Sequence, residues 1–144
     1  FCGAYFSNRL TSVVVTLASL WVSDLFINAM YMGGFVPFYE GFYWQYATFA
    51  LITFIGGVVG RNVKPAMVVG GSLAASMLFF TVSNFGVWTS GLMYPVTPEG
   101  LAACYIAAIP FFGGTLAGDL FYSVLLFGGF ELMKRKLPAL AVAN

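Results

Sequence analysis

Residues 10–32, LTSVVVTLASLWVSDLFINAMYM, decide the fold class of this chain. The run contains a single charged side chain, that of Asp24. A helix that crosses a lipid bilayer needs about 20 predominantly apolar residues. Ser7 and Asn8 precede the run and are residue types that cap the start of a helix. The stretch therefore predicts a transmembrane helix.

The composition of the whole chain agrees with this prediction. Of its 144 residues, 60% are hydrophobic and 8% are charged, and the mean hydropathy is +0.90. Soluble globular domains carry roughly 25% charged residues, and a domain this small exposes much of its surface to its solvent. We therefore predict an integral membrane protein whose first partner is the lipid bilayer.

Further apolar runs follow the first one. Pro65 and the pair Thr97–Pro98 suit the starts of helices, and residues 1–6 read as the end of a preceding helix. The expected spans are about 10–32, 42–60, 66–83, 101–112 and 115–133. We predict an all-α, polytopic transmembrane helix bundle of about six membrane segments, the first incomplete, forming a single domain over residues 1–144.

The charges leave the topology of this bundle open. The aromatic residues expected at one membrane edge are Trp44, Tyr46, Trp88 and Tyr94. The basic residues expected at the opposite edge are Arg9, Arg61 and Lys64. If every segment crosses, the basic run 134–136 lies on the aromatic side, and the positive-inside rule decides nothing. If 101–112 is re-entrant instead, all six basic residues share one edge.

An internal repeat favours the arrangement in which every segment crosses. DLFINAMYMGGF at 24–35 and DLFYSVLLFGGF at 119–130 share Asp, Leu, Phe, Gly, Gly and Phe at the same spacing. Two copies of one pattern most simply run in the same direction through the bilayer. That direction requires three crossings between the copies, so we expect the six-segment arrangement.

Each copy of the repeat begins with a carboxyl group inside an apolar run. An acid near the centre of a membrane helix costs about 2.5–3.5 kcal/mol on insertion scales, and no Lys, Arg or His lies inside a predicted span. Asn28 and Ser123 follow Asp24 and Asp119 by four residues, so each pair shares a helix face. If the two helices pack side by side, the four groups line one polar pocket for a small solute. Alternatively, the acids only tie helices together.

A second candidate region is NFGVWTSGLMYP at 84–95. Asn84, Trp88 and Tyr94 combine an amide with amphipathic aromatic rings, which line an entrance to the pocket or form an interfacial belt. Small residues also recur four apart, for example Gly56 with Gly60 and Gly114 with Gly118. In lipid such spacings allow close approach of helices, including helices of other membrane protein subunits.

Several function classes are not expected. There is no histidine and the net charge is +1, so neither a histidine-based metal centre nor nucleic-acid binding is predicted. Cys2 and Cys104 have no zinc-type spacing. The common catalytic and nucleotide-binding patterns are also missing. We expect no enzymatic activity and no metal, and the sequence assigns no cofactor.

Four stretches carry a resemblance to a known family. They are LWVSDLFIN at 20–28, FFTVSNFGVW at 79–88, YPVTPEGLAACYIAAIPFF at 94–112 and TLAGDLFYSVLLFGGF at 115–130. Across Gly3 to Lys136 the chain resembles a bacterial family of small membrane proteins that is known only as a domain of unknown function. Members of that family typically have an additional N-terminal stretch that completes the first helix.

The size and hydropathy of that family are similar to those of the substrate-binding S components of energy-coupling-factor vitamin transporters. Those proteins are six-helix bundles that hold a vitamin or metal ion near one membrane face and dock on a partner subunit. The resemblance implies a solute-binding or transport protein in the bacterial inner membrane, with a small-molecule solute as its ligand. The alternative is a non-catalytic accessory or structural subunit of a larger membrane complex.

Overall fold

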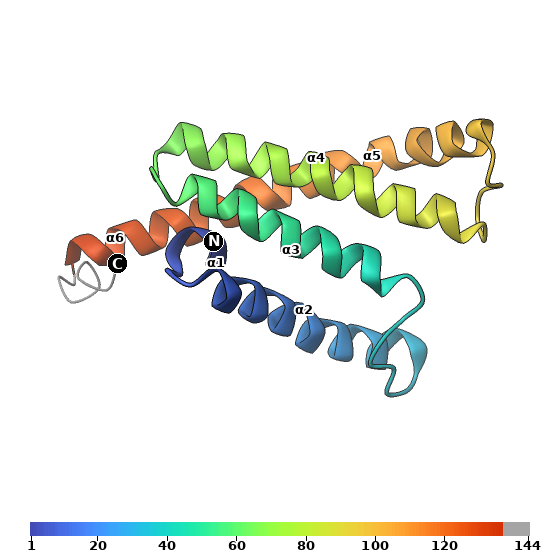
Figure 1. Ribbon diagram of the computed structural model, residues 1–144, viewed down its shortest axis with the longest axis horizontal. Coiled ribbons are helices and arrows are strands. Elements are labelled where there is room, and N and C mark those ends of the chain that lie inside the picture. Colours follow the sequence, from blue (N-terminus) through green and yellow to red (C-terminus); the bar gives the residue numbers. More distant parts are fainter. Residues whose placement is uncertain (137–144) are drawn as a thin grey trace.

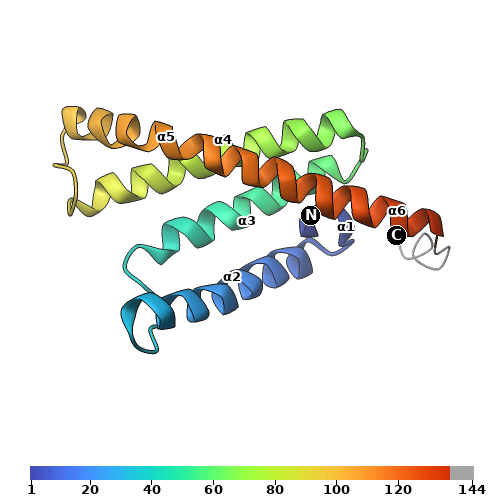
Figure 2. The ribbon, with the colours of Figure 1, turned by 180° about the vertical axis from the view of Figure 1, so that it is seen from behind.

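The computed structural model describes residues 1–136, and helices account for all of the regular structure in that range (Figure 1). The elements are α1 (Cys2–Tyr5), α2 (Arg9–Met32), α3 (Phe42–Val59), α4 (Pro65–Ser90), α5 (Pro98–Ser123), the π-helix η1 (Val124–Gly128) and α6 (Gly129–Lys136). The last three join into one helix without a break (Figure 2). Among the described residues, four helices are long and apolar enough to cross a membrane. The predicted all-α integral membrane fold is confirmed.

The predicted helix starts are also confirmed. The side chain of Asn8 accepts hydrogen bonds from the backbone N–H groups of Leu10 and Thr11, at 2.8 and 3.4 Å. Thr97 caps α5 in the same way, and a proline opens both α4 and α5. These caps satisfy N–H groups that have no partner in the first turn of a helix.

The part of the chain that the structure describes has four helices able to span a membrane, so the prediction of about six membrane segments is not supported. Residues 101–112 and 115–133 belong to one helix of 39 residues, from Pro98 to Lys136. Gly113 and Gly114 weaken a helix by about 1 kcal/mol each in water, and Pro110 lacks a backbone N–H. Lipid offers an unwound backbone no hydrogen-bond partners, so the helix continues through these residues. Residues 1–6 contain only the short α1.

The third predicted span also ends later than expected. Helix α4 continues to Ser90 and ends at Gly91, whose φ of 66° lies in the left-handed region. Within it the Asn84 side-chain amide donates to the Phe80 carbonyl at 2.7 Å. A polar side chain that bonds to its own helix in this way does not interrupt the helix. Asn84 and Trp88 therefore lie on α4 and not in a loop.

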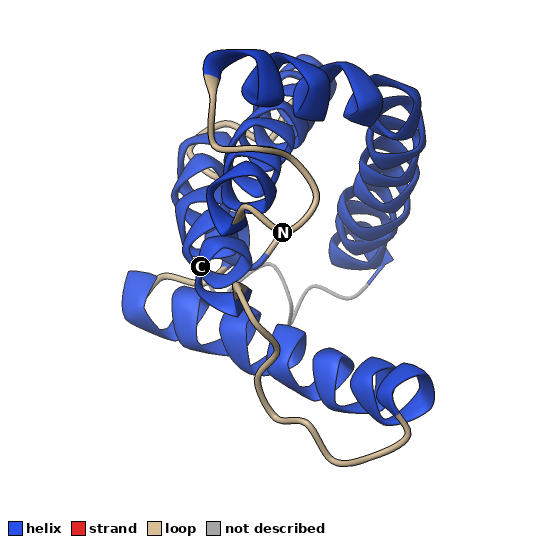
Figure 3. Cartoon of the chain, turned by 90° about the vertical axis from the view of Figure 1, so that its right-hand side faces the viewer, coloured by secondary structure: helices blue, strands red, loops and turns tan. Residues whose placement is uncertain are grey.

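The long helices form an open row. The main packing is between sequence neighbours: α2 on α3, α3 on α4 and α4 on α5. Figures 1 and 2 both show α3 between α2 and α4, with the α5–α6 helix crossing on one side of this layer. In the end view of Figure 3, α2 lies lowest, as it does in Figure 1. The described helices therefore do not close into a ring around one core.

The short α1 packs between α3 and the C-terminal α6. A Cβ added to Gly60 would lie 2.3 Å from the Ala4 carbonyl oxygen, so α1 and α3 meet backbone to backbone. On its other side, the Tyr5 hydroxyl donates to Glu131 Oε1 at 2.7 Å, and the Tyr5 and Phe130 rings lie 4.4 Å apart. Helix α1 thus connects α3 to α6.

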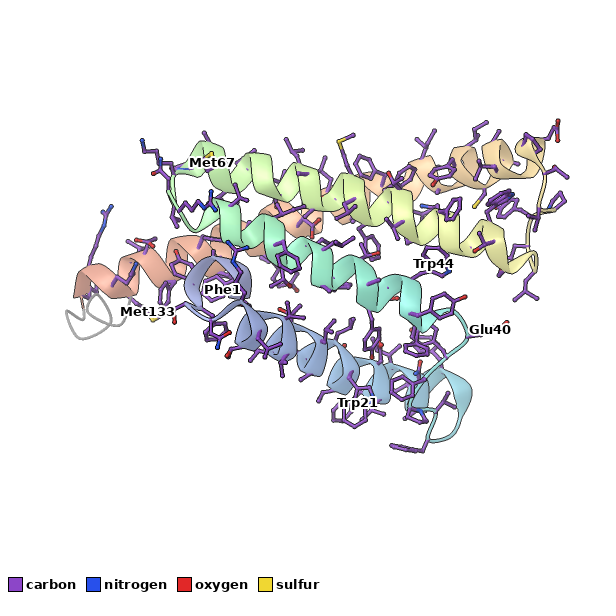
Figure 4. All side chains as sticks on the ribbon, in the orientation of Figure 1. Phe1, Trp21, Glu40, Trp44, Met67 and Met133 are labelled. Carbon is purple, nitrogen blue, oxygen red and sulfur yellow. The ribbon has the colours of Figure 1, made fainter. Side chains whose placement is uncertain are left out.

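The basic residues gather at one end of the molecule. The ends of the long helices that lie together with α1 carry all six basic residues, Arg9, Arg61, Lys64, Lys134, Arg135 and Lys136. Figure 4 shows Phe1, Met67 and Met133 toward this end, which we call the basic edge, and Glu40 and Trp44 at the opposite, outer edge. The expected split of basic residues between two edges is wrong, because 101–136 crosses once. By the positive-inside rule we expect the basic edge to face the cytoplasm.

Single-cysteine labelling tests this topology. In a background without Cys2 and Cys104, Lys64→Cys and Lys136→Cys should react with a membrane-impermeant maleimide from the same side of the membrane. Glu40→Cys should react from the other side. Labelling of positions 64 and 136 from opposite sides would contradict a single crossing by residues 98–136.

The contact between α1 and α3 makes a prediction about stability. Gly60→Ala should lower the free energy of unfolding by about 1–3 kcal/mol, because the new Cβ overlaps the Ala4 backbone. Gly70→Ala is the matched control, since nothing lies within 4 Å of its Cβ position, and it should be neutral or slightly stabilising. Thermal unfolding in detergent measures both, and equal effects would argue against the packing described here.

Candidate functional site

Four polar side chains meet between the first half of α4 and the last turns of α5. The Ser76 hydroxyl donates to Asp119 Oδ2, and the hydroxyls of Ser72 and Ser123 are hydrogen-bonded at 3.0 Å. Ser72 and Ser76 are buried and lie one helical turn apart. We call these residues, Ser72, Ser76, Asp119 and Ser123, the Asp119 cluster.

The hydrogen bonds of this cluster can accommodate a proton on the carboxyl group. The Ser76 hydroxyl lies within hydrogen-bond distance of both the Ser72 carbonyl, at 3.0 Å, and Asp119 Oδ2. A hydroxyl has one proton but two acceptor lone pairs. Both contacts are therefore full hydrogen bonds when the Asp119 carboxyl donates to Ser76 and Ser76 donates to Ser72.

The cluster lines an intramembrane cavity of about 160 Å³. Ser72, Asp119 and Ser123 supply its polar side chains, and its other walls come from α3, α4, Phe1 and Phe127. No Lys or Arg lines it. The volume is several times the share of one liquid water molecule, about 30 Å³, so the cavity has room for a few waters or a small solute.

A larger cavity of about 430 Å³ leads from the basic edge toward this site. It lies between the start of α4 and the η1–α6 segment, and it shares Val68, Ser123 and Phe127 with the smaller cavity. Lys64, Glu131 and Arg135 line it as well. The two cavities adjoin, and a route from the charged membrane edge to Asp119 would pass through both.

A π-helix borders this route. Segment η1 begins directly after Ser123, and its Phe127 lines both cavities. π-helical turns inside α-helices are rare and frequently occur at functional sites. Sequence reasoning placed Ser123 on a regular helix and missed this feature, for which the sequence offers no clear signal beyond the pair Gly128–Gly129.

Asp24 and Asn28 lie in a different part of the protein. Both are 7% exposed. The Tyr46 hydroxyl donates to Asp24 Oδ2 at 3.0 Å, and the Asn28 amide donates to the Val36 carbonyl at 2.9 Å. These contacts tie α2 to α3 and to the loop between them, toward the outer edge.

The predicted single pocket, shared by Asp24, Asn28, Asp119 and Ser123, is therefore not formed. Helix α2 packs on α1 and α3, whereas α5 packs on α4 and η1. The reason is the packing order, because α3 and α4 lie between α2 and α5. With an odd number of helix reversals between them, α2 runs toward the outer edge and α5 runs away from it. The structure brings Asp119 and Ser123 together at one cavity. Asp24 and Asn28 lie apart from them, between α2, α3 and the loop that joins these helices.

Residues 84–94 do not line an entrance to the Asp119 cavity. The Trp88 indole N–H donates to the carbonyls of Pro95 and Thr97, at 3.1 and 3.2 Å, and so holds the turn between α4 and α5. Asn84 borders a separate, mostly aromatic cavity of about 250 Å³, and Tyr94 lies half-buried in the turn. Ligand binding by Asn84, Trp88 and Tyr94 stays a prediction.

Ser72 and Ser76 are the site residues that sequence reasoning missed. Their signal was present, because two serines four residues apart share one face of an otherwise apolar helix. Among residues 1–136, no group of three or more His, Cys, Asp or Glu side chains could hold a metal ion. Hydrogen bonding is the chemistry that the Asp119 cluster offers.

Comparison with known proteins gave one match. The model of a family of unknown function, DUF6580, matches residues 1–140 of the chain. No curated protein and no solved structure matches it.

Tyr39, in the loop between α2 and α3, is coupled to the Asp24 region. Its hydroxyl donates to Gln45 Oε1. Burial and, to a lesser extent, the charge of Asp24 raise the pKa of Tyr39 from 10.0 to about 12. The folded protein therefore binds this proton more tightly than the unfolded chain does. The stabilisation is complete below the unfolded pKa and is lost as the pH rises through the folded pKa.

This coupling predicts a pH dependence of stability. Between the unfolded pKa of 10.0 and the folded pKa of about 12, the thermal midpoint of the wild-type protein should fall more steeply than that of Tyr39→Phe. Tyr31→Phe, at a side chain that is 86% exposed, should keep the wild-type slope. Thermal unfolding in detergent across this range measures the slopes. Parallel slopes for wild type and Tyr39→Phe would contradict the coupling.

Proposed function

We propose that this chain, which belongs to the DUF6580 family of unknown function, is a non-enzymatic membrane protein that binds a small polar solute at the Asp119 cluster. The solute reaches the site from the basic edge, through the cavity between α4 and the η1–α6 segment. Binding of this kind is the first step of transport or of delivery to a partner subunit. We place the protein in the bacterial inner membrane because its sequence resembles the bacterial family of small membrane proteins described above.

The observation that carries this proposal is the position of the Asp119 carboxyl group. It lies near the middle of a membrane-spanning helix and lines a cavity in which no basic side chain offsets its charge. A carboxyl group in this setting is costly. Intramembrane acids usually mark a path or a site for a solute, an ion or a proton.

The chemistry of the cavity limits the class of solute. A carboxyl group and serine hydroxyls favour a ligand with N–H or O–H donors, and an amine also neutralises a carboxylate. The volume of about 160 Å³ admits only a small group. An S-component-like role agrees with solute capture at one face, although the four membrane helices described here differ from the six-helix bundles of that class.

A second candidate function, that of an accessory subunit, has its own support. Nothing lies within 4 Å of the Cβ positions of Gly70, Gly113, Gly114 and Gly118. Open glycine positions on a membrane helix allow another helix to approach closely. In the open row, α2 and α5 do not pack on each other. A larger complex would cover these faces.

Thermal unfolding of the purified protein with a panel of amines, amino acids, vitamins and metal ions tests the solute-binding proposal. A ligand at about 100 times its Kd stabilises the folded state by about 2.7 kcal/mol, which raises the melting temperature by several degrees. Asp119→Asn should abolish this shift. Asp24→Asn is the matched control, because it changes a buried acid outside the cavity, and it should keep the shift.

Other outcomes decide against solute binding at this site. A shift that Asp24→Asn removes and Asp119→Asn retains would move the site to the outer edge. If no member of the panel shifts the melting temperature, and Gly114→Leu releases a protein that otherwise co-purifies, the accessory-subunit function is favoured. Gly70→Leu makes the same change on α4. Comparing the two variants shows whether the co-purifying protein contacts α5 or α4.

A further inference from the structure

We propose that Arg9 and Arg61 bind the phosphate headgroup of an anionic phospholipid at the basic edge. The two side chains line a cavity of about 210 Å³ between α1, the start of α2 and the end of α3. This cavity shares no lining residue with the Asp119 cavity or with the route that leads to it. The inference is therefore independent of the proposed solute site.

Neither arginine has an acidic side chain as its partner. All five acids of the chain lie within the described residues, and the one salt bridge found there joins Lys134 to Glu131 at 3.4 Å. Asp24 and Asp119 bond to Tyr46 and Ser76. No acid lines the cavity either. Two guanidinium groups beside a cavity without a counter-charge favour an anionic ligand.

The local packing explains why both guanidinium groups reach the same space. Arg9 opens α2, and Arg61 directly follows Gly60 at the end of α3. At Gly57 an added Cβ would lie 3.8 Å from Arg9 Nη1, so the Arg9 side chain extends across the backbone of α3. The planar guanidinium fork pairs with phosphate oxygens through parallel hydrogen bonds.

The start of α2 does not supply this binding. The side chain of Asn8 already accepts from the Leu10 and Thr11 N–H groups. Ser12 bonds to the carbonyls of Cys2 and Asn8. The two arginine side chains and the Ser7 hydroxyl are therefore the groups of this cavity that are left to hold an anion.

The cavity also has an apolar side, which favours a lipid over a free anion. Phe6 and Phe54 line it and are 44% and 48% exposed. A diacyl lipid places its hydrocarbon chains against such rings while its phosphate meets the arginines. Basic pockets between membrane helices on the cytoplasmic side bind anionic headgroups, and the positive-inside rule predicts that the basic edge lies on that side.

The other basic residues do not make an equivalent site. Lys64 and Arg135 line the larger cavity, and the acid Glu131 lines it with them. Lys134 pairs with the same carboxylate, and Lys136 is exposed at the end of α6. Lys136→Gln therefore removes one charge from the same edge without changing the proposed site.

Native mass spectrometry of the full chain tests the proposal. The protein is extracted from vesicles that contain equal amounts of phosphatidylglycerol and phosphatidylcholine, and the retained lipids are counted. We expect preferential retention of phosphatidylglycerol. Arg9→Gln and Arg61→Gln should each weaken this retention by about tenfold, as expected for the loss of a charged hydrogen bond. Lys136→Gln should leave it unchanged.

Three results would overturn the proposal. One is equal retention of the two lipids by the wild-type protein, and another is an equal loss in Lys136→Gln, which would indicate general attraction to the basic edge. The third is stabilisation by inorganic phosphate, measured by thermal unfolding, without any by phosphatidylglycerol, which would identify a free anion as the ligand. Arg61→Lys keeps the positive charge but loses the planar guanidinium fork, so it should retain more phosphatidylglycerol than Arg61→Gln and less than the wild-type protein. This partial recovery excludes misfolding as the cause of the loss in Arg61→Gln.

Discussion

The absence of water in the hydrocarbon core is the constraint on which this structure depends. Every backbone N–H and C=O group in lipid needs a partner within the protein. Residues 98–136 consequently remain one helix through Pro110 and the glycines at 113 and 114. At about 1.5 Å per residue this helix is about 58 Å long, roughly twice the hydrocarbon thickness. Its single crossing places all six basic residues at one edge and brings the η1–α6 segment against α1.

The same constraint explains which polar side chains need tertiary partners. Many serines and threonines bond to a carbonyl of their own helix, as Thr48 and Thr53 do, so their position says little about packing. An ionised carboxyl group can accept hydrogen bonds but cannot donate them, and its own helix offers no free N–H group as a donor. Asp24 and Asp119 are therefore each stabilised by a hydroxyl from a neighbouring helix. Only Asp119 also lines a cavity, and this difference separates the structural acid from the candidate site.

The two proposed sites differ in how a charge close to lipid is stabilised. At the Asp119 cavity, the carboxyl group can be neutralised by a proton or by a ligand that donates to it. At the cavity lined by Arg9 and Arg61, the charge lies at the membrane edge, where a phosphate group offsets it. The cavity lined by Arg9 and Arg61 borders α1, and Phe1, which directly precedes α1, lines the Asp119 cavity.

By itself, the sequence determined the membrane environment, the all-α fold, the helix starts at Asn8, Pro65 and Thr97, and the presence of two costly acids. These features follow from local composition and from caps, which act within one helical turn. The number of crossings, the π-helix and the partners of the acids depended on the tertiary structure. Proline and glycine signals that end a helix in water do not end it in lipid. The sequence repeat that begins at Asp24 and at Asp119 carries no information about the direction in which each helix crosses the membrane. Only the packing order of the helices placed these two acids in separate clusters.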